Sequence, residues 1–333
     1  MQRILLTLTG LLLLFLFWLL RPDDSPPVVT IPANLPELNF TVEAAGDAVR
    51  RSELRAGPLK ADNHARIVWN PEYRNRKAPC SLVYIHGFTA SYGEGSPFHV
   101  RTARELGCNL YVARLHGHGL RTDEPLRNMN PDSLIADAAE ALAIGNLIGD
   151  RVILTGNSMG GILAMHLAAE HPESVDVLVL LAPLLDFASP TSYLFDKTWG
   201  QRLMQLILRE PYLREPPDND DHARYWYNFF HIESLMQLTA MKKKLLADDP
   251  ATRIRQPVFT GYYYKDEWEQ DEIVSVSTIQ EMEYRLATSE ASREFRAFPD
   301  IDSHVITSAY RTTHHGAVSE AVISFLKANL PDG

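Results

Sequence analysis

The stretch V-I-L-T-G-N-S-M-G-G-I-L-A, residues 152–164, decides how the rest of this chain is interpreted. An apolar run typical of a buried strand stops at a glycine, a short turn follows, and a small, apolar pattern typical of a helix begins. Ser158 therefore lies at the tip of a strand–turn–helix unit. Such a turn strains the serine backbone, so only small residues fit two positions before and after it, where Gly156 and Gly160 stand.

A serine in this setting has an ordinary interpretation, which is a chance Gly-Ser-Gly turn, and a functional one. The strand before it and the helix after it favour the functional interpretation, because the strained turn pushes the hydroxyl out toward a substrate. The N–H of Met159 lies near the helix N-terminus and points where an oxyanion would form. Ser158 is thus a candidate nucleophile, and Met159 a candidate oxyanion donor.

Length and charge narrow the class of protein. The chain has 333 residues, of which 45% are hydrophobic and 22% charged, enough for one large α/β domain with an insertion or for two small domains. Its net charge is −10, and its isoelectric point is about 5.6. Because an acidic protein does not attract phosphate backbones, nucleic acid is disfavoured as a partner.

The N-terminal residues 4–20 carry no charge, and as a helix they would span about 25 Å, against a bilayer core of about 30 Å. No small-residue cleavage site follows at once, and residues 22–37 hold five prolines, which is typical of an extended spacer. We therefore expect an uncleaved signal anchor, with a cleaved signal peptide as the alternative. Arg3 before the segment and Asp23 and Asp24 after it favour a body outside the cytoplasm, periplasmic or extracellular.

The two cysteines, Cys80 and Cys108, each stand one residue before a strand-like run. If the two strands are parallel neighbours, the sulfur atoms start side by side and can form a disulfide, which would agree with export. Two buried free thiols are an equally good interpretation of the same pattern.

Strand-like and helix-like patterns alternate along most of the chain. Strands are predicted at residues 39–43, 65–69, 80–85, 109–115, 152–154, 175–181, 258–264 and 295–298, and helices at 97–106, 131–148, 279–286 and 317–330. Strands that are apolar throughout and alternate with helices indicate an α/β fold with a doubly wound, mostly parallel sheet covered on both faces.

Residues 186–256 break this alternation, because they are helical, aromatic and charged by turns and contain no predicted strand. We interpret them as a helical cap inserted between two strands of the sheet, with a second independent domain as the alternative. The predicted organisation is an anchor or signal peptide at 1–21, a proline-rich spacer at 22–37, a first part of the core at 38–185, the cap at 186–256, and a second part of the core at 257–333.

A serine hydroxyl becomes nucleophilic only with a base within hydrogen-bond reach and a carboxylate that orients that base. In a doubly wound sheet such groups lie in loops after the carboxyl ends of strands. His304 follows the last predicted strand, and Asp266 and Asp271 follow the strand before it. The remaining histidine motifs have structural interpretations: His314 and His315 open a helix, and His116 and His118 sit in a glycine turn where a paired-histidine metal site is a minor alternative.

Four motifs together resemble the serine hydrolases of the α/β-hydrolase fold, and most closely the monoglyceride lipase and carboxylesterase branch. They are H-G-F at residues 86–88, H-G-H-G at 116–119, G-N-S-M-G-G at 156–161 and S-H-V-I at 303–306, and the resemblance covers roughly residues 60–330. It implies an oxyanion hole made by the backbone N–H groups of Phe88 and Met159, with His304 as the base. It also implies a reaction without a metal or organic cofactor.

The acid of the triad has two candidates. The family pattern at this strand end resembles D-x-x-V, which Asp271 fits and Asp266 does not. Asp266 nevertheless follows the predicted strand more directly. We predict Asp271, with Asp266 as the alternative acid.

The predicted function is cleavage of carboxylic esters, such as acyl esters or monoacylglycerol-like and lysolipid-like lipids, through an acyl-enzyme. The cap aromatics either form an acyl tunnel or are only the core of the cap. A peptidase of the prolyl-aminopeptidase type is the alternative, in which Asp218, Asp220 and Asp221 would hold a substrate amine. A non-enzymatic binding protein is disfavoured by the intact Ser158 and His304. Dehalogenase chemistry would need Asp at position 158.

Overall fold

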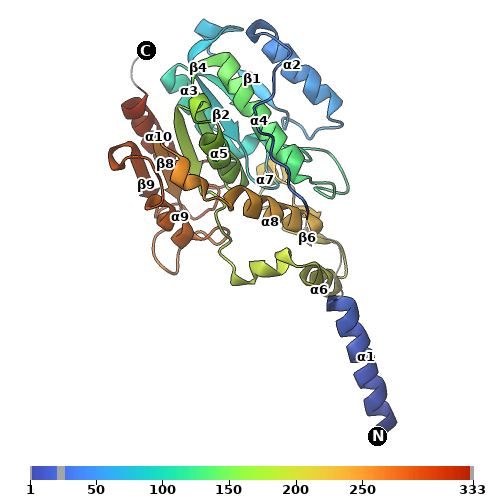
Figure 1. Cartoon of the computed structure of the whole chain (residues 1–333). Coiled ribbons are helices and arrows are strands. Elements are labelled where there is room, and N and C mark those ends of the chain that lie inside the picture. Colours follow the sequence, from blue (N-terminus) through green and yellow to red (C-terminus); the bar gives the residue numbers. More distant parts are fainter. Residues whose placement is uncertain (1, 21–26, 331–333) are drawn as a thin grey trace.

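A seven-stranded sheet forms the centre of the molecule in the computed structural model, which describes residues 2–20 and 27–330 (Figure 1). Its order is β1-β3-β2-β4-β5-β8-β9, and only β1 runs antiparallel to its neighbour. The strands are β1 (Arg66–Val68), β2 (Ala78–Ile85), β3 (Asn109–Val112), β4 (Gly149–Asn157), β5 (Val177–Leu181), β8 (Val258–Tyr262) and β9 (Arg293–Ala297). The predicted doubly wound, mostly parallel sheet is confirmed.

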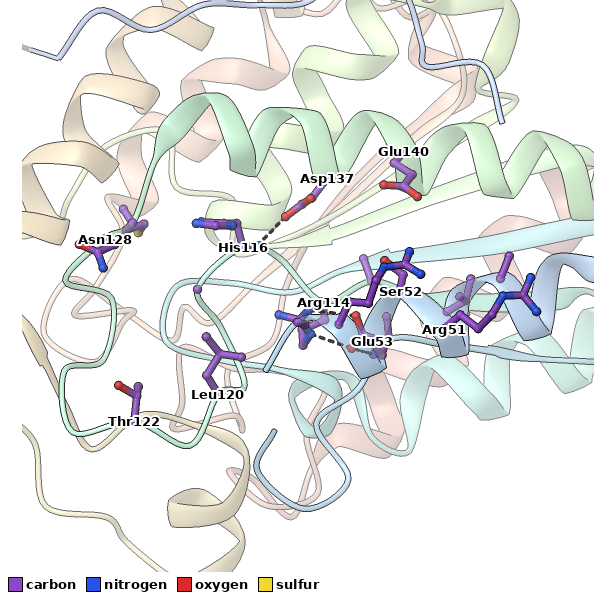
Figure 2. A pocket seen from close by; sticks show the side chains of 18 of the residues that line it. Arg51, Ser52, Glu53, Arg114, His116, Leu120, Thr122, Asn128, Asp137 and Glu140 are labelled. Atoms are coloured by element: carbon purple, nitrogen blue, oxygen red, sulfur yellow. Dashed lines mark hydrogen bonds and ion pairs between the residues drawn. The ribbon is translucent and has the colours of Figure 1, made fainter. Parts of the chain in front are cut away.

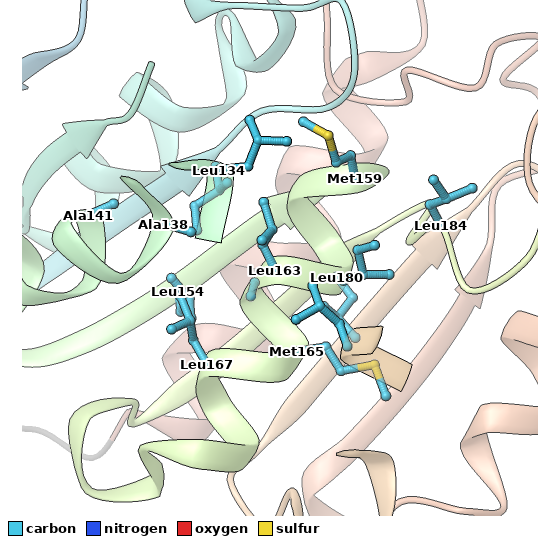
Figure 3. Packing of buried hydrophobic residues seen from close by; sticks show 14 of the residues in the cluster. Leu134, Ala138, Ala141, Leu154, Met159, Leu163, Met165, Leu167, Leu180 and Leu184 are labelled. Atoms are coloured by element: carbon cyan, nitrogen blue, oxygen red, sulfur yellow. The ribbon is translucent and has the colours of Figure 1, made fainter. Parts of the chain in front are cut away.

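Helices cover both faces of this sheet. The helices of the core are α2 (Val42–Arg55), α3 (Phe98–Leu106), α4 (Pro131–Ile148), α5 (Met159–Glu170), α9 (Val276–Glu283) and α10 (His315–Asn329). One apolar cluster joins α4, α5 and α9 to one face, where Leu163 of α5 lies between Leu154 of β4 and Leu134 of α4 (Figure 3). A second cluster joins α3 and α10 to the other face. Alternate residues of each strand point to opposite faces, so the buried strands are apolar throughout.

The predicted strand at residues 39–43 is wrong, because α2 begins at Val42. Thr41 precedes the helix with an extended backbone, as an N-cap residue does. Ala45, Val49 and Glu53 then recur every four residues as its buried side. The alternation of apolar and polar residues in N-F-T-V-E extends over only five residues, whereas the helical pattern of buried residues extends through most of α2.

The segment between β5 and β8 forms a cap over the carboxyl end of the sheet and is not purely helical. Its helices are α6 (Thr198–Leu208), α7 (Asp220–Tyr225) and α8 (Glu233–Leu246), and its strands are β6 (Tyr212–Arg214) and β7 (Phe229–His231). The two strands pair antiparallel, which corrects the prediction of a cap without strands. Strands of three residues carry too little alternation to be recognised. In this pair, Tyr212 makes edge-to-face contacts with Phe229 and His231 of the partner strand.

The N-terminal segment forms helix α1 (Gln2–Leu20), which projects from the body beside α6 of the cap (Figure 1). The Arg202 guanidinium donates a hydrogen bond to the carbonyl of Trp18 at 2.9 Å. Within residues 2–20 and 27–330, no helix combines the length and apolarity needed to cross a membrane.

Cys80 and Cys108 form a disulfide, which decides between the two interpretations of these residues. Ser81 of β2 pairs with Asn109 of β3 in the parallel register, so the residues just before them start side by side with their Cα atoms 4.6 Å apart. The bond ties the start of β2 to the loop between α3 and β3.

Candidate active site

Ser158 lies in the turn between β4 and α5 with φ 52° and ψ −115°, which confirms the strained backbone expected from the sequence. The two glycines around it are required by close backbone contacts. A Cβ atom at Gly156 would lie 2.1 Å from the Gly160 carbonyl oxygen, and one at Gly160 would lie 2.1 Å from that of Ile85. Only 6% of Ser158 is exposed, so the serine is buried in the site.

His304 and Asp271 meet from two loops at the carboxyl end of the sheet. His304 Nδ1 lies 2.7 Å from Asp271 Oδ2, while the backbone N–H groups of Ile273 and Val274 donate to Asp271 Oδ1 at 2.9 and 3.0 Å. Asp271 is only 3% exposed, whereas 16% of the His304 side chain remains accessible. Both oxygens of the Asp271 carboxylate therefore have hydrogen-bond partners, and the His304 ring is bound to Asp271 through Nδ1.

The same contact shifts both pKa values. Burial would raise the pKa of Asp271, but the charge and hydrogen bond of His304 and the two backbone N–H groups lower it overall. Burial would lower the pKa of His304, but the Asp271 carboxylate raises it overall, with a smaller contribution from Glu94. The contact thus stabilises the charged form of each group.

Asp266, the alternative acid, does not take part in this arrangement. Its carboxylate accepts the backbone N–H groups of Trp268 and Glu269 at 2.8 and 2.9 Å and closes an exposed turn. These N–H groups lower the pKa of Asp266.

The H-G-F turn after β2 packs against the serine. A Cβ atom added to Gly87 would lie 3.1 Å from Ser158 Cβ, so the turn and the serine are in direct contact. Met159 is the first residue of α5, and its N–H belongs to the first turn, where N–H groups lack partners within the helix. The Phe88 ring contacts Phe230 of the cap edge to face, with their centroids 5.0 Å apart. Phe88, which follows Gly87, and Met159, which follows Ser158, are therefore both close to the serine in the fold.

His86 and His118, from the H-G-F and H-G-H-G turns, are uncharged and bind the backbone of these turns. His86 Nε2 accepts the N–H of Leu115 at 3.0 Å, so the proton on Nδ1 is donated to the Gly87 carbonyl at 2.8 Å. Burial lowers the pKa of His86 to about 4 and places the pKa of His118 well below its usual range. Across the described ranges, 2–20 and 27–330, no group of three or more His, Cys, Asp or Glu residues could hold a metal ion.

One buried acidic residue beside this site was missed by sequence reasoning. Glu94 is 2% exposed, and its Oε2 accepts the N–H of Gly87 at 2.8 Å. Its signal in the sequence is a single glutamate within Y-G-E-G, eight positions after His86, and nothing local distinguishes it from a solvated loop residue.

The aromatic residues of the cap fall into two groups. Tyr225 and Trp226 are buried against Ala90 and Val305, the residue after His304, so they form a core that seats the cap on the site. Leu206 and Ile207 of α6 are 50% and 63% exposed and line no core. Among the acidic residues at 218–221, Asp218 is already ion-paired with Arg311.

A cavity of about 870 Å³ lies between α2, α4 and the H-G-H-G turn (Figure 2). Glu53 and Arg114 form an ion pair on one side, and Asp137 accepts the N–H of His116 at 2.6 Å on the other. Burial raises the pKa of Asp137 to about 7. Neither Ser158 nor His304 lines this cavity, which places it outside the candidate active site.

The fold and the site together define an α/β hydrolase, and the comparison with protein families agrees. The model of the alpha/beta hydrolase family matches residues 82–315. The chain therefore belongs to the alpha/beta hydrolase family. The matched region includes the four motifs and every candidate catalytic residue.

Individual relatives are more distant. The chain is 28% identical over 130 residues to the 2-hydroxy-6-oxononadienedioate/2-hydroxy-6-oxononatrienedioate hydrolase of a Pseudomonas species, covering 39% of this chain and 45% of that protein. It is 29% identical over 108 residues to the thermostable monoacylglycerol lipase of a Bacillus species, covering 31% and 41%. The chain thus spans less than half the length of these two curated relatives.

Among solved structures, the chain is similar to that described for LipS and LipT, two metagenome-derived lipolytic enzymes. The TM-score is 0.65 at 16% sequence identity, and the similarity covers 81% of this chain and 99% of that chain. At this identity the likeness concerns the fold.

Proposed function

We propose that this protein is a serine hydrolase that cleaves carboxylic esters, with Ser158 as nucleophile, His304 as base and Asp271 as the acid that orients it. The observation that carries the proposal is a strained serine packed against the H-G-F turn, at the end of the sheet where His304 is bound to a buried carboxylate. This combination of residue types is what acyl transfer requires.

The proposed reaction follows from these positions. His304 Nε2 takes the proton of Ser158 as the hydroxyl oxygen attacks the ester carbonyl, and the Asp271 carboxylate stabilises the imidazolium. The backbone N–H groups of Phe88 and Met159 bind the tetrahedral oxyanion. The alcohol leaves with the proton from His304, and a water molecule activated by the same histidine then releases the acid from Ser158.

The proposed substrates are acyl esters with an apolar chain, of the monoacylglycerol or lysolipid kind. Phe88 follows the glycine that contacts the serine, is only partly buried, and packs on Phe230 of the cap, so its ring offers aromatic surface that suits a hydrocarbon chain. The similarity to a monoacylglycerol lipase supports the same class. The ion pair of Asp218 with Arg311 leaves the peptidase alternative without a free carboxylate at that position to hold an amine.

We further propose that the body lies outside the cytoplasm and is attached to the membrane through residues 4–20. The disulfide between Cys80 and Cys108 supports an oxidising compartment, because disulfides persist there and are rare in the cytosol. The exposed apolar side chains of α1, including Leu13, Leu14 and Phe17, support contact with lipid.

The first experiment compares Ser158→Ala with the native chain on p-nitrophenyl esters of increasing acyl length. We expect kcat to fall by about 10⁴-fold or more, because the nucleophile is removed while the fold is kept. Ser277→Ala, at an exposed serine near the start of α9, is the matched control and should keep full activity.

The acyl length that gives the highest kcat/KM would then size the acyl site. Equal activity of Ser158→Ala and the native chain would reject the proposed nucleophile. Hydrolysis of aminoacyl amides but of no ester would favour the peptidase instead.

A further inference from the structure

Glu94 stands in the 3-10 helix η2 (Tyr92–Gly95), directly after the H-G-F turn, and its carboxyl group is buried. Oε2 accepts two hydrogen bonds, from the N–H of Gly87 at 2.8 Å and from the Tyr84 hydroxyl at 3.1 Å. A buried carboxyl group is costly unless it has such partners, so its presence here calls for a physical reason.

The carboxyl group and the proposed nucleophile both lie against the side of Gly87 from which a Cβ atom would project. A Cβ atom at Gly87 would stand 2.8 Å from Glu94 Oε1 and 3.1 Å from Ser158 Cβ. Gly87 also precedes Phe88, whose N–H we assign to the oxyanion hole. The hydrogen bond from Gly87 to Glu94 therefore fixes the peptide next to that donor.

The same short helix is tied to the loop that carries His304. The Thr307 hydroxyl donates to the Glu94 carbonyl at 3.2 Å, and the Ser308 hydroxyl donates to the Gly93 carbonyl at 3.0 Å. Glu94 thus stands where the H-G-F turn and the histidine loop are joined.

Glu94 and His304 interact electrostatically. Burial raises the pKa of Glu94 to about 7, while the Gly87 N–H and the charge of His304 act to lower it. Glu94 in turn raises the pKa of His304, in the same direction as Asp271 and against Arg311. The charge of each group therefore favours the charged form of the other.

The other groups that the structure describes around Glu94 are neutral. The Tyr84 hydroxyl from β2 stays protonated, because burial raises its pKa well above its usual range. His99 from α3, whose ring packs on Tyr84, is neutral because burial lowers its pKa to about 4. The buried amide of Asn157 from β4 faces Glu94, lowers the pKa of Glu94 and carries no charge. His304 is thus the positive partner of this carboxylate.

We propose that Glu94 is a positioning residue of the hydrolytic site, which holds the His86–Gly87 peptide and thereby orients the adjoining N–H of Phe88 toward the oxyanion, and which adds a second negative charge that stabilises the His304 imidazolium. This inference rests on the proposed ester hydrolysis. In that reaction the charge on His304 appears as Ser158 loses its proton, so a carboxylate already in place favours the transition state over the ground state.

The test is Glu94→Gln, measured as kcat and KM for a p-nitrophenyl ester across pH 5 to 9. The amide oxygen can still accept the Gly87 N–H, but the charge is lost. We expect kcat to fall by roughly tenfold or more, with a smaller change in KM. The acid limb of kcat/KM should move to lower pH, because His304 loses one of the two carboxylates that raise its pKa.

Two further variants separate the parts of the proposal. Glu94→Ala also removes the acceptor for Gly87 and should lose more kcat than Glu94→Gln. Tyr84→Phe removes one hydrogen-bond donor to the carboxylate, and this loss raises the pKa of Glu94. The acid limb of kcat/KM should therefore also move to lower pH, but by less than in Glu94→Gln. If Glu94→Gln fails to fold, the shift in Tyr84→Phe still decides the outcome.

Glu53→Gln is the matched control, because Glu53 is another buried carboxylate, bound to Arg114 away from His304. It should lower the melting temperature without moving the acid limb. The inference would be overturned if Glu94→Gln had the same kcat as the native chain and its acid limb of kcat/KM lay at the same pH. Failure of the native chain to hydrolyse any ester, or to be labelled at Ser158 by a fluorophosphonate, would instead reject the proposed function.

Discussion

At the scale of single residues, two aspartates of one loop have separate environments. Asp271 is buried and bound to His304, whereas Asp266 is exposed and closes the turn that precedes it. Asp266 is the second residue of the K-D-E-W-E-Q segment, and Asp271 directly follows that segment. The segment folds back on itself, so that Tyr264 and Gln270 pair as an isolated antiparallel β-bridge. The chain thus returns to the edge of the sheet before Asp271, whose carboxylate binds His304.

Replacing each aspartate by asparagine tests this difference. Asp271→Asn should lower kcat by about 10⁴-fold, because a neutral amide neither holds the required tautomer of His304 nor stabilises its positive charge. Asp266→Asn keeps an oxygen that can accept the N–H groups of Trp268 and Glu269, so its kcat should equal that of the native chain. Loss of activity in Asp266→Asn alone would reverse the assignment of the acid.

At the scale of elements, the unit formed by β4 and α5 depends on the close approach of two backbones. The second residue of α5, Gly160, lies against the end of β2, where a Cβ atom would stand 2.1 Å from the Ile85 carbonyl oxygen. This approach brings the start of α5 next to the H-G-F turn, so the same contact that packs the helix also assembles the site.

Gly160→Ala is therefore expected to destabilise the protein by about 2 kcal/mol or more, because a backbone atom cannot yield as a flexible side chain can. Gly316→Ala is the matched control, since Gly316 is the second residue of α10 and has no atom within 4 Å of an added Cβ. It should be neutral or stabilise by about 0.5–1 kcal/mol. Urea unfolding measures both, and equal effects would contradict the packing explanation.

At the scale of the whole molecule, the cap lies between the core and the N-terminal helix (Figure 1). The cap lies over the carboxyl end of the sheet, and α1 continues outward beside α6 (Figure 1). Leu206 and Ile207 of α6 are exposed, as are the apolar side chains of α1. The proposed membrane attachment therefore places the cap nearest the lipid.

Deletion of residues 1–26 tests this attachment. The core should remain folded, because α1 packs on α6 of the cap, whereas contacts of the N-terminal segment with the core are made by later residues, such as the Thr30 N–H on Asp132. We expect the full-length chain to sediment with membranes and the truncated chain to remain in the supernatant with an unchanged kcat on a soluble ester. A truncated chain that still sediments would show that the attachment lies elsewhere.

Sequence and tertiary structure contributed different parts of this description. The order of strands and helices, the strained turn at Ser158 and the candidates His304 and Asp271 were predictable, because local periodicity and glycine spacing encode them. The start of α2 and the strands β6 and β7 were missed, because short patterns have several solutions that only packing resolves. Glu94 was missed for a stronger reason: the burial of a lone carboxyl group depends on Gly87, Tyr84 and the loop after His304, which meet only when the sheet has formed. The choice between a disulfide and two free thiols was likewise decided by the register of β2 and β3, a contact between distant segments that no local pattern contains.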